Sequence, residues 1–481
     1  MALSIFRRLK IPHVFALLLG VIFFCSLLTY VVPSGEYQRQ ERQIGELTRT
    51  MVLPNTFESL PKHYSLQGVL WGEAVEGQAT PVGILQFLSA IPRGLEQSAD
   101  IIFFIFIIGG VFGILQRTGA ITAAIRSLVN RFANSGPLLT IILVLVISIS
   151  GSTLGMGEEF IPLVPIFLFV SKELGYDRIY GLALVMLAAD IGFAAATTNP
   201  FTVQIAQGIA EVPLGGDIGF RLIFYAACLA ITLTYLLRYG ARVKKDPSQS
   251  IMAGDDFSLA EFQLEEQQLR PAHLWILFVS ALIFSFIIYA VQNMGWWLNE
   301  MAGGFILIGI LAALIGRLSV EEATKAFTHG MTEMVVAALV VGFARGIQVV
   351  LMDGKIMDSL IFYAAQVLQS FPKVVAAEGM LVFQSLLNFF IPSGSGQAAT
   401  TMPLMAPLSD VLGLDRQTAV FAFTCGDGFS NTIIPTSGVL MAMLALAKIP
   451  YDKWLRFMLP LFLQLILASA IFLAITVYWY Q

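Results

Sequence analysis

One short pattern occurs twice in the chain and constrains its fold more than any other feature. The sequence reads Leu-Gly-Tyr-Asp-Arg at 174–178 and Leu-Gly-Leu-Asp-Arg at 412–416. Interruptions rich in Ser, Thr, Gly, Asn or Pro flank each copy, before it at 150–159 and 392–397 and after it at 197–200 and 431–435. Paired interruptions at corresponding positions of two halves indicate a solute-binding site in a membrane protein built from two repeats.

Composition places the chain among helical membrane proteins. Of its 481 residues, 57% are apolar and only 12% are charged, and the mean hydropathy is +0.78. Soluble domains carry about 25% charged residues. Hydrophobic stretches near the length that a spanning helix needs recur along the chain, and the alternation typical of β-barrel strands does not. The predicted fold class is an all-α polytopic membrane protein.

Several functional classes are disfavoured by what the sequence lacks. Its three cysteines, Cys25, Cys228 and Cys425, stand far apart in apolar surroundings, which argues against a disulfide scaffold. Its histidines show no metal-ligand spacing, so we predict no structural metal and no cofactor apart from a coupling Na⁺ or H⁺. The sequence contains no basic tract of the kind that binds nucleic acid, so we predict no nucleic-acid partner. No nucleophile or metalloprotease motif stands in a suitable context, so we do not expect an enzyme.

The hydrophobic runs and their interruptions divide the chain into predicted segments. In order these are a first transmembrane helix (1–33), an external segment and lead-in (34–99), a first repeat (100–240), a cytoplasmic linker (241–271) and a second repeat (272–481). Each repeat is predicted to contain a re-entrant hairpin, at 137–173 and 389–409, and a broken helix, at 178–212 and 416–449. Uninterrupted spans are expected near 13–33, 100–116, 218–240, 272–293, 302–317, 331–351, 373–391 and 454–479. Irregular backbone at membrane depth needs surrounding protein or water, so the interruptions are predicted to lie inside the protein.

Lys and Arg residues predict the orientation. Basic residues within 1–10 precede the first span, and the positive-inside rule places them in the cytoplasm. Basic groups within 117–131, 238–245 and 448–456 mark further cytoplasmic ends and leave the C-terminus outside. When the spans are counted, the one that carries Gly109 and the one that carries Gly342 cross in opposite directions. The two repeats are therefore predicted to be inverted relative to each other.

Two adjacent glutamates, Glu158 and Glu159, lie in the Gly-rich interruption between two apolar segments. A charged side chain at the bilayer centre costs roughly 2.5–3.5 kcal/mol on insertion scales. We predict that this pair binds a cation or a proton near the membrane midplane. The alternative is a hairpin that ends at the aqueous surface, where glutamates are solvated.

Two aspartates, Asp190 and Asp427, lie within apolar helices shortly before a Gly-Phe step. They occupy roughly equivalent places in the two repeats, although the register differs by one residue. Each is suited either to coordinating a cation or to bonding Ser, Thr and backbone groups within the helix packing. We assign Asp427 to the predicted substrate site and Asp190 to a predicted coupling-ion site.

Hydroxyl and amide side chains surround the same interruptions. Half-helix N-termini attract carboxylates, and unwound carbonyls attract Na⁺. Singly such residues are commonly helix caps or packing residues, but their occurrence at four paired interruptions predicts a central site. Besides the two glutamates and Asp427, the predicted substrate-binding residues are Asn199, Ser393, Ser395, Asn431, Thr432 and Thr436. Besides Asp190, the predicted coupling-ion residues are Ser152, Thr153, Thr197 and Gln397.

Four of these motifs resemble a known family. They are Gly155-Met-Gly-Glu-Glu159, Asn199-Pro200 with Gln207-Gly-Ile-Ala210, Ser393-Gly-Ser-Gly-Gln-Ala398 and Gly426-Asp-Gly-Phe-Ser430. Together they resemble the C4-dicarboxylate anaerobic carrier family, and more closely its YfcC-like branch of basic amino acid antiporters of the arginine–ornithine type. The resemblance implies a bacterial inner-membrane protein with the ion-transporter superfamily fold. That fold has two inverted repeats, a scaffold that forms a homodimer, and an elevator-like transport domain.

The charges at the interruptions favour one class of substrate. They include Glu158, Glu159 and Asp427 but no basic residue, and opposite charges attract strongly in a partly dry site. We therefore predict a secondary transporter of a basic amino acid, working by exchange or cation coupling. The glutamates would bind its cationic end or a proton, and Asp427 its ammonium or guanidinium group. The alternative is a Na⁺- or H⁺-coupled carboxylate transporter whose carboxylates bind the coupling ion.

Overall fold

The computed structural model describes residues 14–44, 47–132, 135–255, 269–294 and 296–479. The N-terminal basic residues and part of the predicted linker lie outside these ranges. The first part of the chain contains α2 (Val14–Val31), β1 (Ser34–Glu36), β2 (Arg39–Ile44), β3 (Leu47–Val52), β4 (Glu58–Leu60), α3 (Leu66–Trp71), α4 (Ile84–Gln97), α5 (Ala99–Arg117) and α6 (Ala120–Phe132). The middle contains α7 (Gly136–Leu154), the 3₁₀ helix η1 (Glu158–Leu163), α8 (Val164–Glu173), α9 (Arg178–Ala194), α10 (Val203–Ile209), α11 (Ile218–Lys245), the 3₁₀ helix η2 (Pro247–Gln249), α12 (Pro271–Asn293) and α13 (Leu298–Ile315). The last part contains α14 (Val320–Glu333), α15 (Val335–Asp353), α16 (Met357–Leu368), α17 (Lys373–Asn388), α18 (Gly394–Leu412), α19 (Arg416–Ser430), α20 (Gly438–Ala447) and α21 (Tyr451–Trp479).

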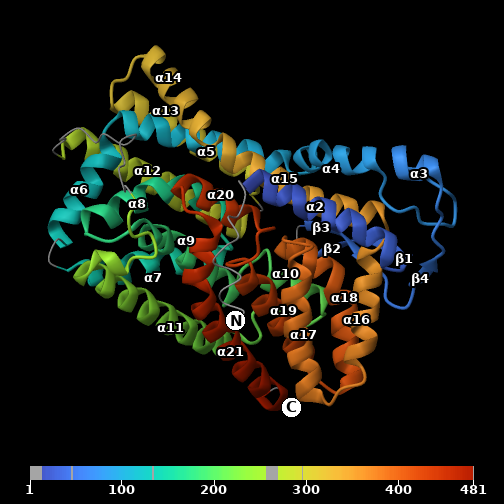
Figure 1. Ribbon diagram of the computed structural model, residues 1–481. Coiled ribbons are helices and arrows are strands. Elements are labelled where there is room, and N and C mark those ends of the chain that lie inside the picture. The colour runs from blue at the N-terminus through green and yellow to red at the C-terminus, as the bar shows by residue number, and fades with distance from the viewer. Residues whose placement is uncertain (1–13, 45–46, 133–134, 256–268, 295, 480–481) are drawn as a thin grey trace.

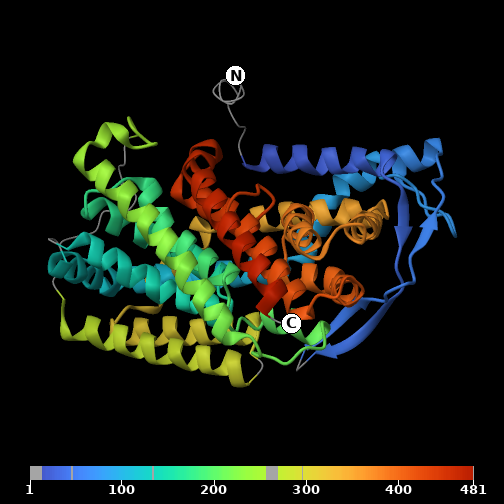
Figure 2. The ribbon, with the colours of Figure 1, turned by 90° about the horizontal axis from the view of Figure 1, so that it is seen from below.

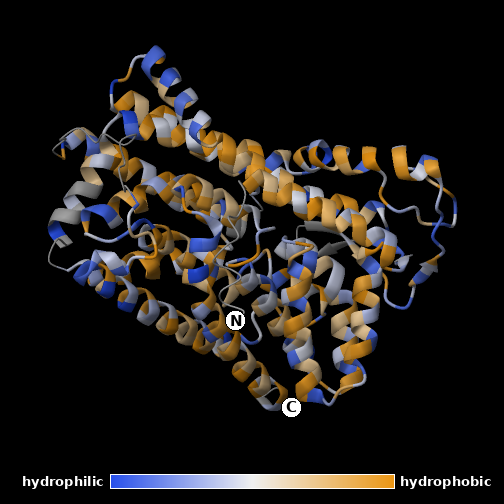
Figure 3. Cartoon of the chain, in the orientation of Figure 1, coloured by the Kyte–Doolittle hydropathy of each residue, from blue (hydrophilic) through white to orange (hydrophobic). Residues whose placement is uncertain are grey.

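Within the described ranges, eight helices are long and apolar enough to cross a membrane, namely α2, α5, α7, α11, α12, α13, α15 and α21. Apolar residues run along the helices, and hydrophilic residues gather at many of their ends and in the connections (Figure 3). These observations confirm a helical membrane protein, and seven of the eight helices coincide with predicted uninterrupted spans. The predicted span at 373–391 is instead the 16-residue helix α17, because the chain leaves the helix after Asn388.

Two tandem helices lie along one side of the molecule (Figure 1). α4 leads into α5 at Ser98, α14 leads into α15 at Met334, and the two tandems run antiparallel. Glycines allow their backbones to touch. A Cβ atom on Gly113 would lie 2.2 Å from the Ala326 carbonyl oxygen, and one on Gly94 would lie 2.4 Å from that of Gly342. Close backbone approach of this kind is typical of membrane helix pairs.

The repeated Leu-Gly-x-Asp-Arg pattern has the same local structure in both copies. Gly175 and Gly413 have φ angles of +79° and +66°, which favour glycine and end α8 and α18. The side chains of Asp177 and Asp415 then cap α9 and α19 by accepting backbone N–H bonds. The pattern therefore encodes a tight turn between two antiparallel helices.

The two broken helices, α9–α10 and α19–α20, pack side by side and run in opposite directions. At one end Arg178, which begins α9, donates to the carbonyl oxygen of Ala447 at the end of α20, with an Nη1–O distance of 3.1 Å. At the other end Arg416, which begins α19, donates to the carbonyl oxygen of Ala210 just after α10, with an Nη1–O distance of 2.9 Å. The two broken helices are thus joined to each other at each end by one arginine of the repeated pattern.

The segment between α2 and α3 forms two small antiparallel sheets that clasp α16. β1 pairs with β4 and β2 with β3, and the β2–β3 hairpin reaches across to α10 and α18 (Figure 2). Asp358 on α16 accepts a hydrogen bond from the Tyr37 backbone N–H at 2.9 Å and an ion-pair contact from Arg39 at 2.7 Å. Phe57 and Phe362 stack with ring centroids 4.0 Å apart.

Replacing Asp358 by Ala is expected to loosen this clasp. The carboxylate is 5% exposed and is the acceptor for both contacts, so its loss leaves the Tyr37 N–H and Arg39 without their partner. Tryptic cleavage within residues 34–60 of the purified protein is expected to become faster than in the parent. Glu58→Ala, which removes an exposed carboxylate from β4, serves as the control. Equal cleavage rates in all three proteins would contradict the prediction.

Candidate functional site

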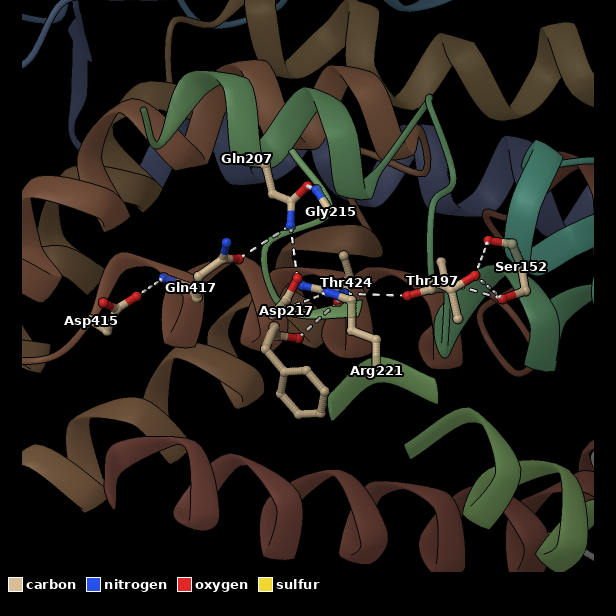
Figure 4. A network of polar contacts seen from close by, with 11 residues as sticks. Ser152, Thr197, Gln207, Gly215, Asp217, Arg221, Asp415, Gln417 and Thr424 are labelled. Carbon is tan, nitrogen blue, oxygen red and sulfur yellow. Dashed lines mark hydrogen bonds and ion pairs between the residues drawn. The ribbon is translucent and has the colours of Figure 1, made fainter. Parts of the chain in front are cut away.

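The tip of the first hairpin meets the break between α9 and α10. Ser152, at the end of α7, lies with its Oγ 3.1 Å from the Thr197 Oγ1 (Figure 4). The Thr197 backbone N–H donates to the carbonyl oxygen and the Oγ of Ser152. A Cβ atom on Gly155 would lie 2.3 Å from the Oδ1 of Asn199. The structure thus brings Ser152, Thr197 and Asn199 together.

The two predicted glutamates begin η1, directly after this tip. Both are half-buried, and the Glu159 Oε2 accepts a hydrogen bond from the Gly157 N–H at 2.9 Å. Glu158 interacts electrostatically with Asp100, in the first turn of α5, and with Asp190 on α9. Carboxylates from three separate elements therefore interact here, and their mutual repulsion favours a proton or a cationic group. Arg345 on α15 also interacts with Asp100, and among the described residues no cluster of acidic, His or Cys side chains is arranged to hold a metal ion.

The tip of the second hairpin meets both broken helices. A Cβ atom on Gly394, the first residue of α18, would lie 3.2 Å from the Asp427 Oδ2 and 2.7 Å from the Thr202 Cγ2. Asp427 is fully buried, and neither of its carboxylate oxygens has a hydrogen-bond partner among the described residues. No contact among the described residues joins it to Glu158. The carboxylates therefore form two groups, one beside each hairpin tip.

Amide side chains fix the second hairpin in place. The Asn388 Nδ2, at the end of α17, donates to the Asp427 carbonyl oxygen at 2.7 Å, to the Ser430 Oγ at 2.8 Å and to the Asn431 Oδ1 at 3.0 Å. The Gln397 Nε2 donates to the Gln384 Oε1 at 2.7 Å, which ties the two hairpin arms together. The break after α19 is thus positioned by the hairpin beside it.

Several other predicted residues make hydrogen bonds within their own segment. Ser393 caps α18, the Thr432 hydroxyl donates to the Phe429 carbonyl oxygen, and the Thr153 hydroxyl donates to that of Ile149 within its own helix. Ser395 is half-buried and Thr436 is fully buried. Thr153 is half-buried near the end of α7.

Buried polar atoms without partners concentrate on these elements. Such an atom is costly unless water or a ligand meets it. Among the described residues, the ones that lie on the hairpins and the broken helices are Asp190 Oδ2, Asn199 Nδ2, Thr202 Oγ1, Asn388 Oδ1, Gln397 Oε1, both oxygens of Asp427, Thr418 Oγ1 and Thr436 Oγ1. Most of them are oxygens, which suit an ammonium group, a guanidinium group or a hard cation.

Comparison with known proteins now identifies the family. Residues 11–478 match the model of the C4-dicarboxylate anaerobic carrier family. The chain belongs to that family. It is 34% identical over 477 residues to the "Putative basic amino acid antiporter YfcC" of Escherichia coli K12, which covers 94% of this chain and 93% of the relative. A Haemophilus influenzae protein without an assigned role is 29% identical over 99% of this chain and 98% of its own length.

Two solved transporter structures are similar to this carrier over most of its length. The YdaH transporter of Alcanivorax borkumensis has a TM-score of 0.46 and 18% identity, with 96% of this chain and 98% of that chain covered. MtrF of Neisseria gonorrhoeae, from a class of antimetabolite efflux pumps, has a TM-score of 0.44 and 17% identity, with 98% and 96% covered. Neither similarity is close enough to assign a substrate.

The carrier also has functional candidates that the sequence analysis missed. The clearest is Arg221 on α11, which is 1% exposed and ion-paired with Asp217 at 2.6 Å (Figure 4). Its Nη1 contacts the Ala196 carbonyl oxygen in the first break, so a basic side chain does reach the site, from outside the interruptions. The sequence did contain a signal for this ion pair, because Asp217 and Arg221 lie four residues apart at the start of an apolar helix. Thr202 and Asn388 were missed because each lies just outside an interruption, Thr202 after 197–200 and Asn388 before 392–397.

Proposed function

We propose that this carrier transports a basic amino acid of the arginine, ornithine or lysine type, by exchange or cation coupling. The observation that carries the proposal concerns Asp427 on α19. Its carboxylate is buried beside the second hairpin tip, and neither of its oxygens has a hydrogen-bond partner among the described residues. Among the described residues no basic side chain pairs with it. An isolated buried carboxylate is very costly, so a cationic group or a proton must meet it during transport.

The solute is proposed to lie with its α-ammonium or guanidinium group at Asp427. Its other cationic group, or a coupling proton, would lie at Glu158 and Glu159, with Asp190 and Asp100 nearby. The Asn199 Nδ2, which is buried and without a partner, is suited to donating to the solute carboxylate. These groups come from both repeats, so the solute would bind where the two halves meet.

An elevator-type movement is proposed to carry this site across the membrane. The opposite directions of α9–α10 and α19–α20 support two inverted repeats. The moving part would comprise α7–α10 and α17–α20, and the α4–α5 and α14–α15 tandems would belong to the static part. η1 and α8 face α5 and α14 across a cavity of about 50 Å³, lined mainly by apolar groups such as Gly109, Gly113, Pro162 and Pro165. A surface of this kind resists sliding less than a hydrogen-bonded one.

Contacts between basic residues and the predicted cytoplasmic linker support the proposed orientation. Lys453 donates to the Ile251 carbonyl oxygen at 3.0 Å, and Arg178 pairs with Asp255 at 2.9 Å. The starts of α21 and α9 therefore lie at the same end as the linker, together with the basic residues that end α11. The positive-inside rule assigns this end to the cytoplasm. The homodimer, the inner-membrane location and the cytoplasmic N-terminus stay predictions.

A carboxylate transporter is the second candidate, because Arg221 brings a guanidinium to the first break. Labelled arginine, ornithine, lysine and succinate, offered to proteoliposomes at varied pH and Na⁺ concentration, separate the two. We expect uptake of the basic amino acids that is stimulated by the same amino acids on the other side. Na⁺-dependent succinate uptake without uptake of basic amino acids would overturn the proposal, and a channel would show no stimulation from the other side.

Glu158→Gln and Glu159→Gln are each expected to lower arginine counterflow by about tenfold or more, as the loss of a charged hydrogen bond predicts. Glutamine keeps the volume of the side chain and removes only the charge. Glu173→Gln is the matched control, because Glu173 is an exposed carboxylate at the far end of the same hairpin. Counterflow at the parent rate in both tip variants would refute a role for the glutamates.

A further inference from the structure

In each of the two helix breaks, a backbone carbonyl at the same position accepts a hydrogen bond from a side chain. α9 ends at Ala194 and α19 ends at Ser430. Two residues later, the Ala196 carbonyl oxygen accepts a hydrogen bond from the Arg221 Nη1 at 3.4 Å, and the Thr432 carbonyl oxygen accepts one from the Trp454 Nε1 at 2.9 Å. Carbonyls beyond a helix end have no partner inside the helix, and the membrane interior offers no bulk water to replace it.

The two donors also come from corresponding places. Arg221 lies in the first turn of α11 and Trp454 in the first turn of α21, and each of these helices directly follows a broken helix. Both side chains are buried, with exposures of 1% and 0%. In both repeats, therefore, a long side chain from the following helix donates a hydrogen bond to a carbonyl in the helix break.

The donors are themselves held rigidly, but by different means. The Arg221 Nε donates to the Asp217 Oδ2 at 2.6 Å and its Nη1 to the Thr424 Oγ1 at 3.3 Å, while Gln207 donates to the other oxygen of Asp217 (Figure 4). Trp454 packs against Phe457, with ring centroids 5.6 Å apart. One break is thus fixed by a charged network that also reaches α19, and the other by a neutral indole.

We propose that Arg221 and Trp454 are positioning residues, each of which holds one helix break in the shape that the transported solute meets. Neither contacts the solute. Each acts by fixing the carbonyl that follows a half-helix, and thereby the neighbouring site residues Thr197 and Asn431. This inference rests on the proposed transport function for its purpose, but its structural claim can be tested without a substrate.

The test is amide hydrogen exchange of purified protein in detergent. Trp454→Phe removes the donor and keeps an aromatic ring. The double variant Asp217→Asn with Arg221→Gln removes the charged cap without leaving a buried charge unpaired. The matched control is Tyr30→Phe, because the Tyr30 hydroxyl donates from α2 to the Val82 carbonyl oxygen, away from both breaks.

Of the two breaks, we expect Trp454→Phe to accelerate exchange only in residues 431–436 and the double variant only in residues 195–201. Tyr30→Phe is expected to change neither segment. Unchanged exchange in both breaks, or equal acceleration of both breaks in all three variants, would overturn the proposal.

A second measurement connects the breaks to transport. In counterflow of labelled L-arginine, both cap variants are expected to raise KM by about tenfold, the size of one lost hydrogen bond in a buried site. The maximal rate is expected to change less than KM, because the carboxylates remain in place. An unchanged KM in both variants would overturn the positioning role, whereas a parent protein that does not transport arginine would refute the proposed substrate and leave the exchange result standing.

Discussion

Replacing Asp427 by Asn is expected to lower counterflow of a basic amino acid by roughly a hundredfold or more, the cost of removing one partner from a buried charge pair. Asparagine has nearly the same shape, so the change removes the charge and little else. The fold should not suffer, because neither carboxylate oxygen has a hydrogen bond among the described residues. Thermal stability of the substrate-free variant is therefore expected to equal or exceed that of the parent.

This combination separates a binding role from a structural one. A packing carboxylate would lose stability when neutralised, and transport would fall only as far as the amount of folded protein does. Asp452→Asn is the control, because Asp452 is an exposed aspartate in the first turn of α21. Counterflow of Asp427→Asn within a few-fold of the parent, measured per folded protein, would remove Asp427 from the site.

Replacing Gly192 by Val is expected to prevent correct folding. Its Cβ would lie 2.1 Å from the Ser148 carbonyl oxygen, which belongs to backbone that cannot move aside without displacing α7. Overpacking of an ordinary core costs about 1–3 kcal/mol, and a clash with rigid backbone should exceed that. Gly428→Val should behave alike, since its Cβ would lie 2.3 Å from the Cα of Ala194 where α9 and α19 cross.

Size-exclusion chromatography of fluorescently tagged protein measures this effect as the loss of the monodisperse peak. Gly303→Val is the matched control, because Gly303 lies inside α13 and no atom lies within 4 Å of a Cβ built there. If Gly192→Val and Gly303→Val gave equal monodisperse peaks, the tight α7–α9 contact would be wrong.

The repeated pattern and the hydrophobic runs could be interpreted correctly from sequence because their causes are local. A bilayer requires apolar helices of a certain length, and seven predicted spans coincide with long apolar helices. The Leu-Gly-x-Asp-Arg pattern combines a glycine suited to positive φ with an aspartate suited to capping, and both copies have that turn. The position of the second hairpin was less accurate, since α17 and α18 meet near 389–393, where the sequence analysis began the hairpin.

The composition of the site depended on contacts between distant segments. Thr202 and Asp427 both lie close to Gly394 at the second hairpin tip, and neither is near it in the sequence. Arg221 reaches the first break from the next span, so a search of the interruptions alone could not include it.

The amino-acid sequence by itself therefore determined the membrane class, the two-fold internal pattern and the acidic residues available for binding, because length, apolarity and turn chemistry act over a few residues. Only the tertiary structure decided which of those acids stay unpartnered and which donors hold the breaks. Burial and pairing depend on segments that meet only in the folded protein, such as Arg221 and Thr424, which are 203 residues apart.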